Sequence, residues 1–313
     1  MSDLAIIVPV YNRVEYTNIF IECLKKNTYK AWTLFIVDDG STDGTGKMLA
    51  DISTGIDPDA QVPMKDGAIY HINGDGNWWW TKSVNKAVEV ALRSGAELIL
   101  TQNNDVEFPS NYLERMVEAH RIKPNAIVTA PIFDLNTGLC LPDGGGVRRN
   151  WITAKDIKLP IVDSRLKDDS SANNCGEVWR ELTHCSGRGC LIPEAVFKKT
   201  GLYDEKRLPQ YAADDDFTYR AAGAGFPVFI YLKTYCLTPA EETGITEFVS
   251  RRSWRTFIGY LTNQKSPANI KRRFWITVRH CKPRWYVPAS LMLDLIRVAV
   301  SYWNRTASID VKK

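Results

Sequence analysis

Long apolar runs are missing from this sequence, although 44% of its 313 residues are hydrophobic. A transmembrane helix needs about 18 or more uninterrupted apolar residues, and no stretch approaches that length. The N-terminus also lacks the basic segment and apolar core of a secretory signal peptide, because residues 4–10 already have the pattern of a buried strand. These absences predict a cytoplasmic protein without a membrane-spanning helix.

Paired cysteine motifs are absent as well. The seven cysteines are scattered, and the closely spaced Cys175, Cys185 and Cys190 contain no C-x-x-C pair. Zinc sites and disulfide frameworks normally show such regular spacings. We therefore expect the cysteines to be reduced and mostly buried.

Two common nucleotide-binding motifs are missing too. No G-x-x-x-x-G-K-[ST] occurs, and the first apolar segment is followed by PVYN at residues 9–12 rather than by G-x-G-x-x-G. Glycine-rich loops of these kinds bring backbone N–H groups close to phosphate. Their absence disfavours both a dinucleotide-binding Rossmann site and a P-loop.

Acidic residues are scarce in the last fifth of the chain. Residues 251–313 contain 14 Lys and Arg but only Asp294 and Asp310, a local charge of +12, whereas the first 250 residues have a charge of −8. Two regions of opposite charge in one chain indicate two different kinds of partner.

Apolar, strand-like segments alternate with helical patterns in the first 130 residues, and a helix is expected over residues 14–26. Repeats of strand, polar loop and helix are typical of parallel βαβ units, whose loops all reach one edge of the sheet. The side chains of Tyr11, Asp38, Asp39, Asn77 and Asp105 should therefore converge there. The expected strands are residues 4–10, 33–37, 68–72, 97–101 and 126–130.

Two polar segments admit both a structural and a functional interpretation. The sequence NND at residues 103–105 follows an expected strand and can either turn the chain or place a carboxylate beside a divalent cation and phosphate. The sequence DDD at residues 214–216 stands where a helix is expected to begin, and a cap together with the helix dipole accounts for one or two of these acids.

Four motifs in this order resemble family 2 glycosyltransferases with the GT-A fold. They are IVPVYN at residues 7–12, VDDGSTD at 37–43, NND at 103–105 and the acidic segment that ends in DFTYR at 216–220. The resemblance covers about residues 4–232. It implies an α/β fold with a mainly parallel central sheet flanked by helices, and transfer of a sugar from a nucleotide-diphosphate sugar with inversion at the anomeric carbon.

The resemblance also implies a division of the chain. Residues 1–245 would form the catalytic domain, with a nucleotide-binding half at about 1–130 and an acceptor half at about 131–245. Residues 246–313 would form a basic, aromatic-rich helical extension at the C-terminus.

The donor site follows from the same resemblance. In the family, certain positions hold the base and ribose of the nucleotide. Their counterparts in this sequence are Pro9, Tyr11 and Asp39, and Asp38 is close by. An aromatic ring can stack on a base, and a carboxylate accepts hydrogen bonds from base N–H or ribose hydroxyl groups. A segment that lies against the nucleotide in similar enzymes corresponds to Asn77 and Asn85, and Asn104 is assigned to nucleotide binding as well. The rings of residues 78–80 (WWW) either pack internally or form a platform for the sugar.

The NND segment takes the place of the family's metal-binding D-x-D, with an amide where the first carboxylate would stand. Asp105 is therefore the expected ligand of Mg²⁺ or Mn²⁺, while diphosphate and water supply most of the coordination. The family often places a third metal contact, a histidine, downstream of the base. No histidine occupies that place here, where Glu241 or Glu242 could substitute.

The family's catalytic base belongs to an E-D pair that precedes an arginine. Alignment on Arg220 places Asp214 at the position of the aspartate and Ala213 at that of the glutamate. Asp214 is accordingly the expected base, and Asp215 or Asp216 takes that role if the register differs. The base would deprotonate an acceptor hydroxyl as it attacks the anomeric carbon.

The C-terminal region alternates cations with aromatic residues over positions 251–305. Such a composition is typical of a segment that lies on an anionic membrane surface. It would bring a peripheral protein to the inner face of the membrane, near a polyprenyl-diphosphate-linked acceptor or glycan of bacterial surface polysaccharide synthesis. The alternatives are packing on the catalytic domain, a homodimer contact, or a nucleic-acid patch, which we do not expect.

Two other functions compete with sugar transfer. A sugar-phosphate nucleotidyltransferase shares the nucleotide-binding sheet, but it needs a glycine-rich, basic first loop, and residues 11–13 (YNR) contain no glycine. A nucleotide-sugar-binding or scaffold protein without turnover is suggested by Asn103 and Ala213, which stand where the family has carboxylates.

Overall fold

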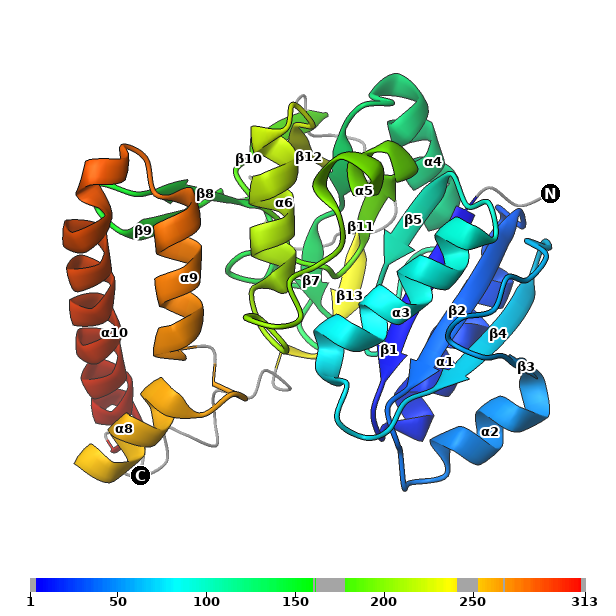
Figure 1. Cartoon of the computed structure of the whole chain (residues 1–313), viewed down its shortest axis with the longest axis horizontal. Coiled ribbons are helices and arrows are strands. Elements are labelled where there is room, and N and C mark those ends of the chain that lie inside the picture. The colour runs from blue at the N-terminus through cyan, green and yellow to red at the C-terminus, as the bar shows by residue number, and fades with distance from the viewer. Residues whose placement is uncertain (1–3, 160, 162–177, 241–252, 267, 311–313) are drawn as a thin grey trace.

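A nine-stranded sheet forms the centre of the protein (Figure 1). The computed structural model describes residues 4–159, 161, 178–240, 253–266 and 268–310. The strand order across the sheet is β10 (Trp179–Leu182), β12 (Val228–Tyr231), β6 (Ile127–Thr129), β11 (Cys190–Pro193), β5 (Leu98–Thr101), β1 (Leu4–Val10), β2 (Trp32–Asp38), β4 (Ala68–Asn73) and β3 (Thr54–Gly55).

The sheet is mainly parallel, as the sequence predicts. Strand β1 pairs in parallel with β2 on one side, where Val10 stands opposite Asp38, and with β5 on the other, where Ile7 stands opposite Thr101. The carboxyl ends of these three strands therefore meet at one edge. Two strands depart from the parallel pattern, because β11 is antiparallel to both β5 and β6 and β10 is antiparallel to β12.

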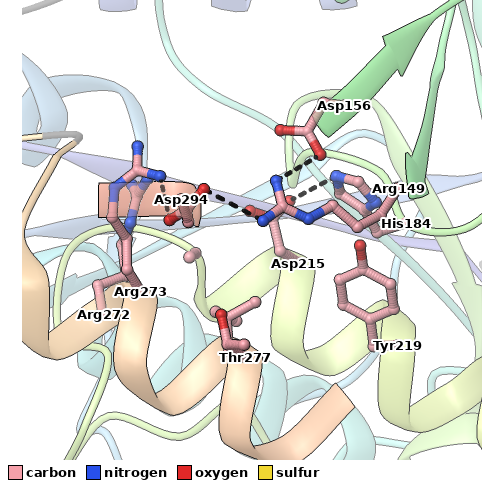
Figure 2. Close-up of a pocket in the computed structure, with 11 residues that line it drawn as sticks. Arg149, Asp156, His184, Asp215, Tyr219, Arg272, Arg273, Thr277 and Asp294 are labelled. Carbon is pink, nitrogen blue, oxygen red and sulfur yellow. Dashed lines mark hydrogen bonds and ion pairs between the residues drawn. The ribbon is translucent and has the colours of Figure 1, made fainter. Parts of the chain in front are cut away.

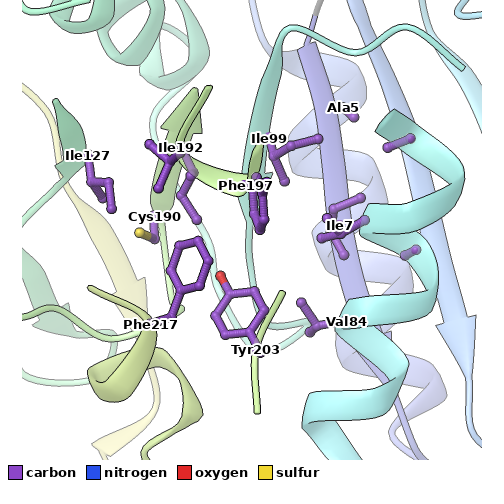
Figure 3. Packing of buried hydrophobic residues seen from close by; sticks show 14 of the residues in the cluster. Ala5, Ile7, Val84, Ile99, Ile127, Cys190, Ile192, Phe197, Tyr203 and Phe217 are labelled. Atoms are coloured by element: carbon purple, nitrogen blue, oxygen red, sulfur yellow. The ribbon is translucent and has the colours of Figure 1, made fainter. Parts of the chain in front are cut away.

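Helices cover both faces of the sheet. Alternate residues of β1 belong to two different apolar clusters, with Ala5 and Ile7 on one face and Ile6 and Val8 on the other, as expected for a strand buried on both sides. Figure 3 shows the first cluster, which joins Phe217 to β1 and β11. The helices of this part are α1 (Val14–Lys26), α2 (Thr45–Ile52), α3 (Trp79–Arg93), α4 (Tyr112–Ile122), α5 (Glu194–Thr200) and α6 (Ala213–Gly223).

Two small sheets complete the second half of the chain. Strand β7 (Ile132–Asp134) pairs in parallel with β13 (Cys236–Thr238), and β8 (Val147–Asn150) forms an antiparallel hairpin with β9 (Lys155–Lys158). The expected loop at residues 168–171 lies outside the described residues. Within the part of the chain that the structure describes, every cysteine is free, as predicted.

The C-terminal extension is helical, as predicted. It comprises α8 (Trp254–Thr262), α9 (Ile270–His280), the 3₁₀ turn η3 (Arg284–Tyr286) and α10 (Val287–Asp310). Tyr260, Val298 and Tyr302 form a small apolar cluster of its own. Helices α9 and α10 run side by side, and α9 lies along α6 of the part that contains the nine-stranded sheet (Figure 1). Among the helices of the described residues, none combines the length and apolarity needed to cross a membrane.

Candidate active site

The carboxylate of Asp39, just after β2, holds the start of α3. Its Oδ1 accepts a hydrogen bond from the backbone N–H of Gly76, and its Oδ2 accepts from those of Trp78 and Trp79, each at 2.9 Å. A side chain at Gly74 would bring a Cβ within 2.5 Å of Oδ1, so only glycine fits there. Asp39 thus binds N–H groups that a helix start leaves without partners.

The loops after β1 and β2 are fastened to each other. Asn12 donates from its backbone N–H to Oγ of Ser41 (2.7 Å) and accepts from the N–H of Thr42 (2.8 Å). Oδ1 of Asp38 accepts from the N–H of Ser41 (3.0 Å). The ring of Tyr11 remains 58% exposed at the rim. The expected convergence of Tyr11, Asp38 and Asp39 therefore agrees with the geometry, and Pro9, half-buried, lies two residues before Tyr11.

Asn85, expected beside the nucleotide, is bonded within the protein. Its Nδ2 donates to the carbonyl of Tyr203 and to Oε2 of Glu205, while its Oδ1 accepts from the N–H of Tyr203. With 4% of its surface exposed, the side chain clamps α3 to this loop. Asn77, in contrast, is exposed beside Gly76.

Asp105 occupies the end of β5 and keeps one carboxylate oxygen without a partner. Its Oδ2 accepts from Nη1 of Arg13 at 2.9 Å, which ties this strand end to the loop after β1. Its Oδ1 is buried and makes no hydrogen bond. An orphaned, buried carboxylate oxygen at this position is a fitting ligand for a divalent cation.

Its neighbour Asn104, expected to bind nucleotide, is bonded to α1. Nδ2 of Asn104 donates to Oγ1 of Thr17 at 2.9 Å, and Thr17 in turn donates to the carbonyl of Arg13. The amide is buried and braces the first turn of α1. Asn104 therefore supports the turn that carries Arg13, which contacts Asp105.

A second protein ligand for a metal is not evident. No group of three or more His, Cys, Asp or Glu side chains in the described part of the chain is placed to hold an ion. Glu241 and Glu242, the sequence's candidates for a further ligand, lie outside the described residues. The donor set around Asp105 thus fits a cation whose coordination is completed mainly by diphosphate and water.

The three consecutive aspartates of α6 have three different environments. Asp214 accepts hydrogen bonds from the N–H groups of Gly187 (2.8 Å) and Asp215 (3.0 Å). Burial, together with the charge of Asp215, raises the pKa of Asp214 to about 6. Burial likewise raises the pKa of Asp215 to about 6, and its Oδ1 lies 3.8 Å from Nε2 of His184.

Asp216 is a structural anchor. It is completely buried and accepts from Nε of Arg220 (2.9 Å), Nη1 of Arg279 (3.0 Å) and Nε2 of His280 (2.8 Å). Burial alone would raise its pKa, but the hydrogen bonds from His280 and Arg220 outweigh it and hold the pKa well below its ordinary value. Since Asp216 is saturated by cations, only Asp214 and Asp215 remain as candidates for a base.

Trp80 connects the two halves of the site. Its indole Nε1 donates to Oδ1 of Asn103 at 3.3 Å. On its other side a Cβ at Gly187 would lie 2.6 Å from the indole ring and 3.6 Å from Cβ of Asp214, so glycine is required for this close approach. The end of β5 and the start of α6 are therefore bridged by one ring. Of the neighbouring rings, Trp78 is buried, whereas Trp79 and Trp80 are half-buried.

The loop before α6 is fixed against α3 under local strain. Oε1 of Gln210 accepts from the N–H of Trp80 at 3.1 Å, one residue beyond the N–H groups that Asp39 binds. Trp79 and Ala212 both adopt positive φ angles, 58° and 63°, which non-glycine residues rarely do. Such strained residues concentrate at functional sites, where surrounding contacts over-determine the backbone.

A polar pocket lies beside Asp215, between α6, the β8–β9 hairpin and the extension (Figure 2). Arg149 of β8 bonds to Asp156 (3.1 Å) and to Asp294 of α10 (3.2 Å), and Arg273 of α9 also bonds to Asp294 (2.6 Å). The extension thus packs against β8 and α6, one of the alternatives that the sequence left open. Arg272, Arg279 and His280 at this contact were not among the predicted site residues, because only their composition was visible in the sequence.

Comparisons with known proteins agree with this architecture. Residues 5–143 match the model of the family described as "Glycosyl transferase family 2". Glycosyltransferase GlyG of Streptococcus pneumoniae serotype 4 is 24% identical over 135 residues, which cover 43% of this chain and 40% of that protein. The matched region is therefore less than half the length of the curated relative.

Solved structures resemble a much larger part of the chain. TarS of S. aureus (residues 1–349) has a TM-score of 0.56 and 13% identity, covering 94% of this chain and 71% of that chain. Mannosyltransferase PcManGT of Pyrobaculum calidifontis also has a TM-score of 0.56, with 14% identity, covering 98% of this chain and 75% of that chain. Residues 5–143 are thus similar to glycosyl transferase family 2, and the chain has the GT-A fold of these solved structures.

Proposed function

We propose that the protein is an inverting glycosyltransferase that moves a sugar from a nucleotide-diphosphate sugar to an acceptor hydroxyl group. The main support is Asp214, a half-buried carboxyl with a pKa of about 6 that accepts a hydrogen bond from Gly187, the residue against which Trp80 packs. A pKa near the working pH suits a general base, which must be ionised yet accept a proton readily.

In the proposed reaction Asp214 takes the proton of the acceptor hydroxyl as that oxygen attacks the anomeric carbon. The bond from this carbon to the diphosphate breaks at the same time, and the nucleoside diphosphate leaves with the bonding electrons. Attack from the face opposite the leaving group inverts the configuration. Because Trp80 lies between Asp214 and Asn103, its ring is our candidate for the surface that the transferred sugar contacts.

The donor nucleotide is proposed to bind along the ends of β1 and β2. The exposed ring of Tyr11 can stack on the base, beside Pro9, and Asp38 can accept a further hydrogen bond from ribose or base. Asp39 already holds three backbone N–H groups, so its contribution is to fix the loop that carries Asn77 as much as to contact ligand. Solved relatives bound to UDP-GlcNAc or GDP-Man support a nucleotide-sugar donor.

A divalent cation, Mg²⁺ or Mn²⁺, would be held by Oδ1 of Asp105 together with diphosphate oxygens. When bound it would offset the charge that develops on the leaving diphosphate. Structures of PcManGT and of GalNAc-T7 that contain Mn²⁺ support a divalent metal. Arg13, bonded to Oδ2 of Asp105, keeps the carboxylate oriented.

We further propose that the acceptor is a glycan or a polyprenyl-diphosphate-linked glycan of bacterial surface polysaccharide synthesis. The outer face of the extension supports contact with an anionic membrane surface on the cytoplasmic side. Met292, Ile296 and Val300 form an exposed stripe along α10, each more than half exposed, and Trp285 is 79% exposed just before it. Cations flank the stripe, as anionic headgroups would require: Lys282, Arg284 and Arg297.

A nucleotide panel tests the donor site. We expect UDP, GDP or TDP to raise the Tm of the full chain, with a larger rise when Mn²⁺ is present. Asp105→Ala should abolish the Mn²⁺-dependent increment and keep the metal-independent one. Failure of every nucleotide to bind would refute the proposal. Binding without release of nucleoside diphosphate from any nucleotide sugar would favour a scaffold, and formation of pyrophosphate from a sugar phosphate would favour a nucleotidyltransferase.

Vesicle sedimentation tests the membrane contact. The chain should sediment with vesicles of anionic phospholipid at low salt and remain free with zwitterionic vesicles. Replacing both Met292 and Ile296 by Glu should abolish sedimentation. Ile122→Glu is the matched control, because Ile122 is equally exposed (56%) but lies on α4 of the catalytic part. A concentration-dependent dimer that the double substitution dissolves would instead assign the stripe to a second copy of the chain.

A further inference from the structure

Arg272 is a partly buried cation without a direct partner. It lies in the first turn of α9 and lines the pocket beside Asp215 (Figure 2). Among the described residues its guanidinium makes no hydrogen bond or ion pair, and its contact is with the ring of Tyr211, whose centroid lies 5.8 Å away. Burial, together with the neighbouring charge of Arg273, lowers the pKa of Arg272, whereas the charges of Asp215 and Asp214 act in the opposite direction.

The other cations of the pocket are already paired. Arg149 and Arg273 share Asp294, and Arg149 also bonds to Asp156. Even so, Nε of Arg149 and Nε of Arg273 are buried donors without an acceptor. Because these two Nε atoms have almost no accessible surface, the guanidinium of Arg272 is the group on the pocket wall that remains for a ligand.

A charge that has lost part of its hydration without gaining a partner is unfavourable, and proteins normally pair such a charge. Arg272 cannot lose its proton at cellular pH. Neither Asp214 nor Asp215 approaches it within ion-pair distance. The guanidinium of Arg272 is therefore available to bind an anion that is not part of the chain. Its planar arrangement of N–H donors matches the oxygens of a phosphate group.

We propose that Arg272 binds a phosphoryl group of the acceptor and so places the accepting hydroxyl beside Asp214. This inference rests on the proposed function and selects a phosphate-bearing acceptor over a neutral glycan. The pocket is built by α6, the β8–β9 hairpin and the extension, whereas Tyr11, Asp39 and Asp105 of the donor side take no part in it. Asp215, on the pocket wall, can donate to a phosphate oxygen when it carries a proton.

Glucose 1-phosphate serves as the probe, with glucose as the neutral comparison. Calorimetric titration of the full chain should show binding of the phosphate and none of the sugar alone. Arg272→Gln should weaken the Kd for glucose 1-phosphate by about ten- to a hundredfold, the range for one charge-assisted contact to phosphate. Lys271→Gln is the matched control, since it removes a neighbouring exposed cation from the same helix and should leave the Kd unchanged.

Donor-side measurements separate this proposal from the proposed function. Arg272→Gln should keep the wild-type affinity for nucleoside diphosphate with Mn²⁺ and the wild-type rate of nucleotide-sugar hydrolysis without acceptor. A parallel loss of donor affinity would assign Arg272 to the donor diphosphate and overturn the proposal. It is overturned as well if the wild type fails to bind glucose 1-phosphate, or if Lys271→Gln weakens binding as much as Arg272→Gln does. If no nucleotide binds to any variant, the transferase function fails while the titration still decides the role of Arg272.

Discussion

Two pairs of adjacent aspartates, Asp38–Asp39 and Asp214–Asp215, lie on opposite sides of the site and have opposite surroundings. Asp39 is surrounded by backbone N–H groups, three of which bond to its carboxylate. Asp214 receives two such bonds, but burial and the neighbouring Asp215 prevail and raise its pKa to about 6. A carboxylate whose oxygens are bonded to several N–H donors is suited to holding loops in place. A carboxylate whose lost hydration is poorly replaced by hydrogen bonds is suited to exchanging a proton.

The largest effect that this comparison predicts is at Asp214. Asp214→Asn removes the proton acceptor and should reduce sugar transfer by about 10²- to 10⁴-fold, the usual contribution of a general base. Asp215→Asn should reduce transfer far less. Measured kcat and KM for both variants, with nucleotide affinity as a check on folding, decide the assignment. Substantial turnover by Asp214→Asn, or a greater loss in Asp215→Asn, would transfer the role of base to Asp215.

The donor-side pair should respond in stability instead. Asp39→Ala leaves the N–H groups of Gly76, Trp78 and Trp79 without their acceptor and should lower the free energy of unfolding by about 2 kcal/mol. Asp38→Ala removes one bond, to Ser41, and should have a smaller effect. Urea denaturation of both variants measures the difference. Equal losses of stability in the two variants would contradict the larger structural role of Asp39.

The pH dependence of transfer sharpens the comparison. Because Asp214 must be ionised to act as a base and its pKa is about 6, kcat/KM should fall about tenfold per pH unit below this value. The charge of Asp215 contributes to raising that pKa, so Asp215→Asn should move the acid limb to lower pH. An acid limb that stays in place in Asp215→Asn would show that the two carboxyls are not coupled.

The smallest effect concerns Tyr11. Its exposed ring packs little in the free protein, so Tyr11→Ala should leave the Tm unchanged. Loss of stacking on the base should weaken nucleoside diphosphate binding by about 1 kcal/mol, close to fivefold in Kd. Tyr11→Phe keeps the ring and should bind like the wild type, which calorimetry can verify.

Much of the donor half could be predicted because its signals are local. The bounds of β1 and α1 match the predicted residues 4–10 and 14–26, and Tyr11, Asp38, Asp39 and Asp105 stand at strand ends that parallel pairing brings to one edge. The antiparallel direction of β11 could not be predicted, since an apolar run carries no information on direction. The internal hydrogen bonds of Asn85 and Asn104 could not be predicted either, because proximity to a motif does not reveal which way an amide side chain points.

The sequence by itself determined the order of elements, the edge where polar groups gather and the basic, helical character of the C-terminus. These follow from periodicity and composition over short stretches. Only the tertiary structure decided which partners each charged side chain has. Asp216 pairs with Arg279 and His280 across more than 60 residues. Arg272, on the same helix, meets no carboxylate directly within the described part of the chain. Three adjacent aspartates became an anchor, a candidate base and a pocket wall because burial and distant partners, not residue type, set their ionisation.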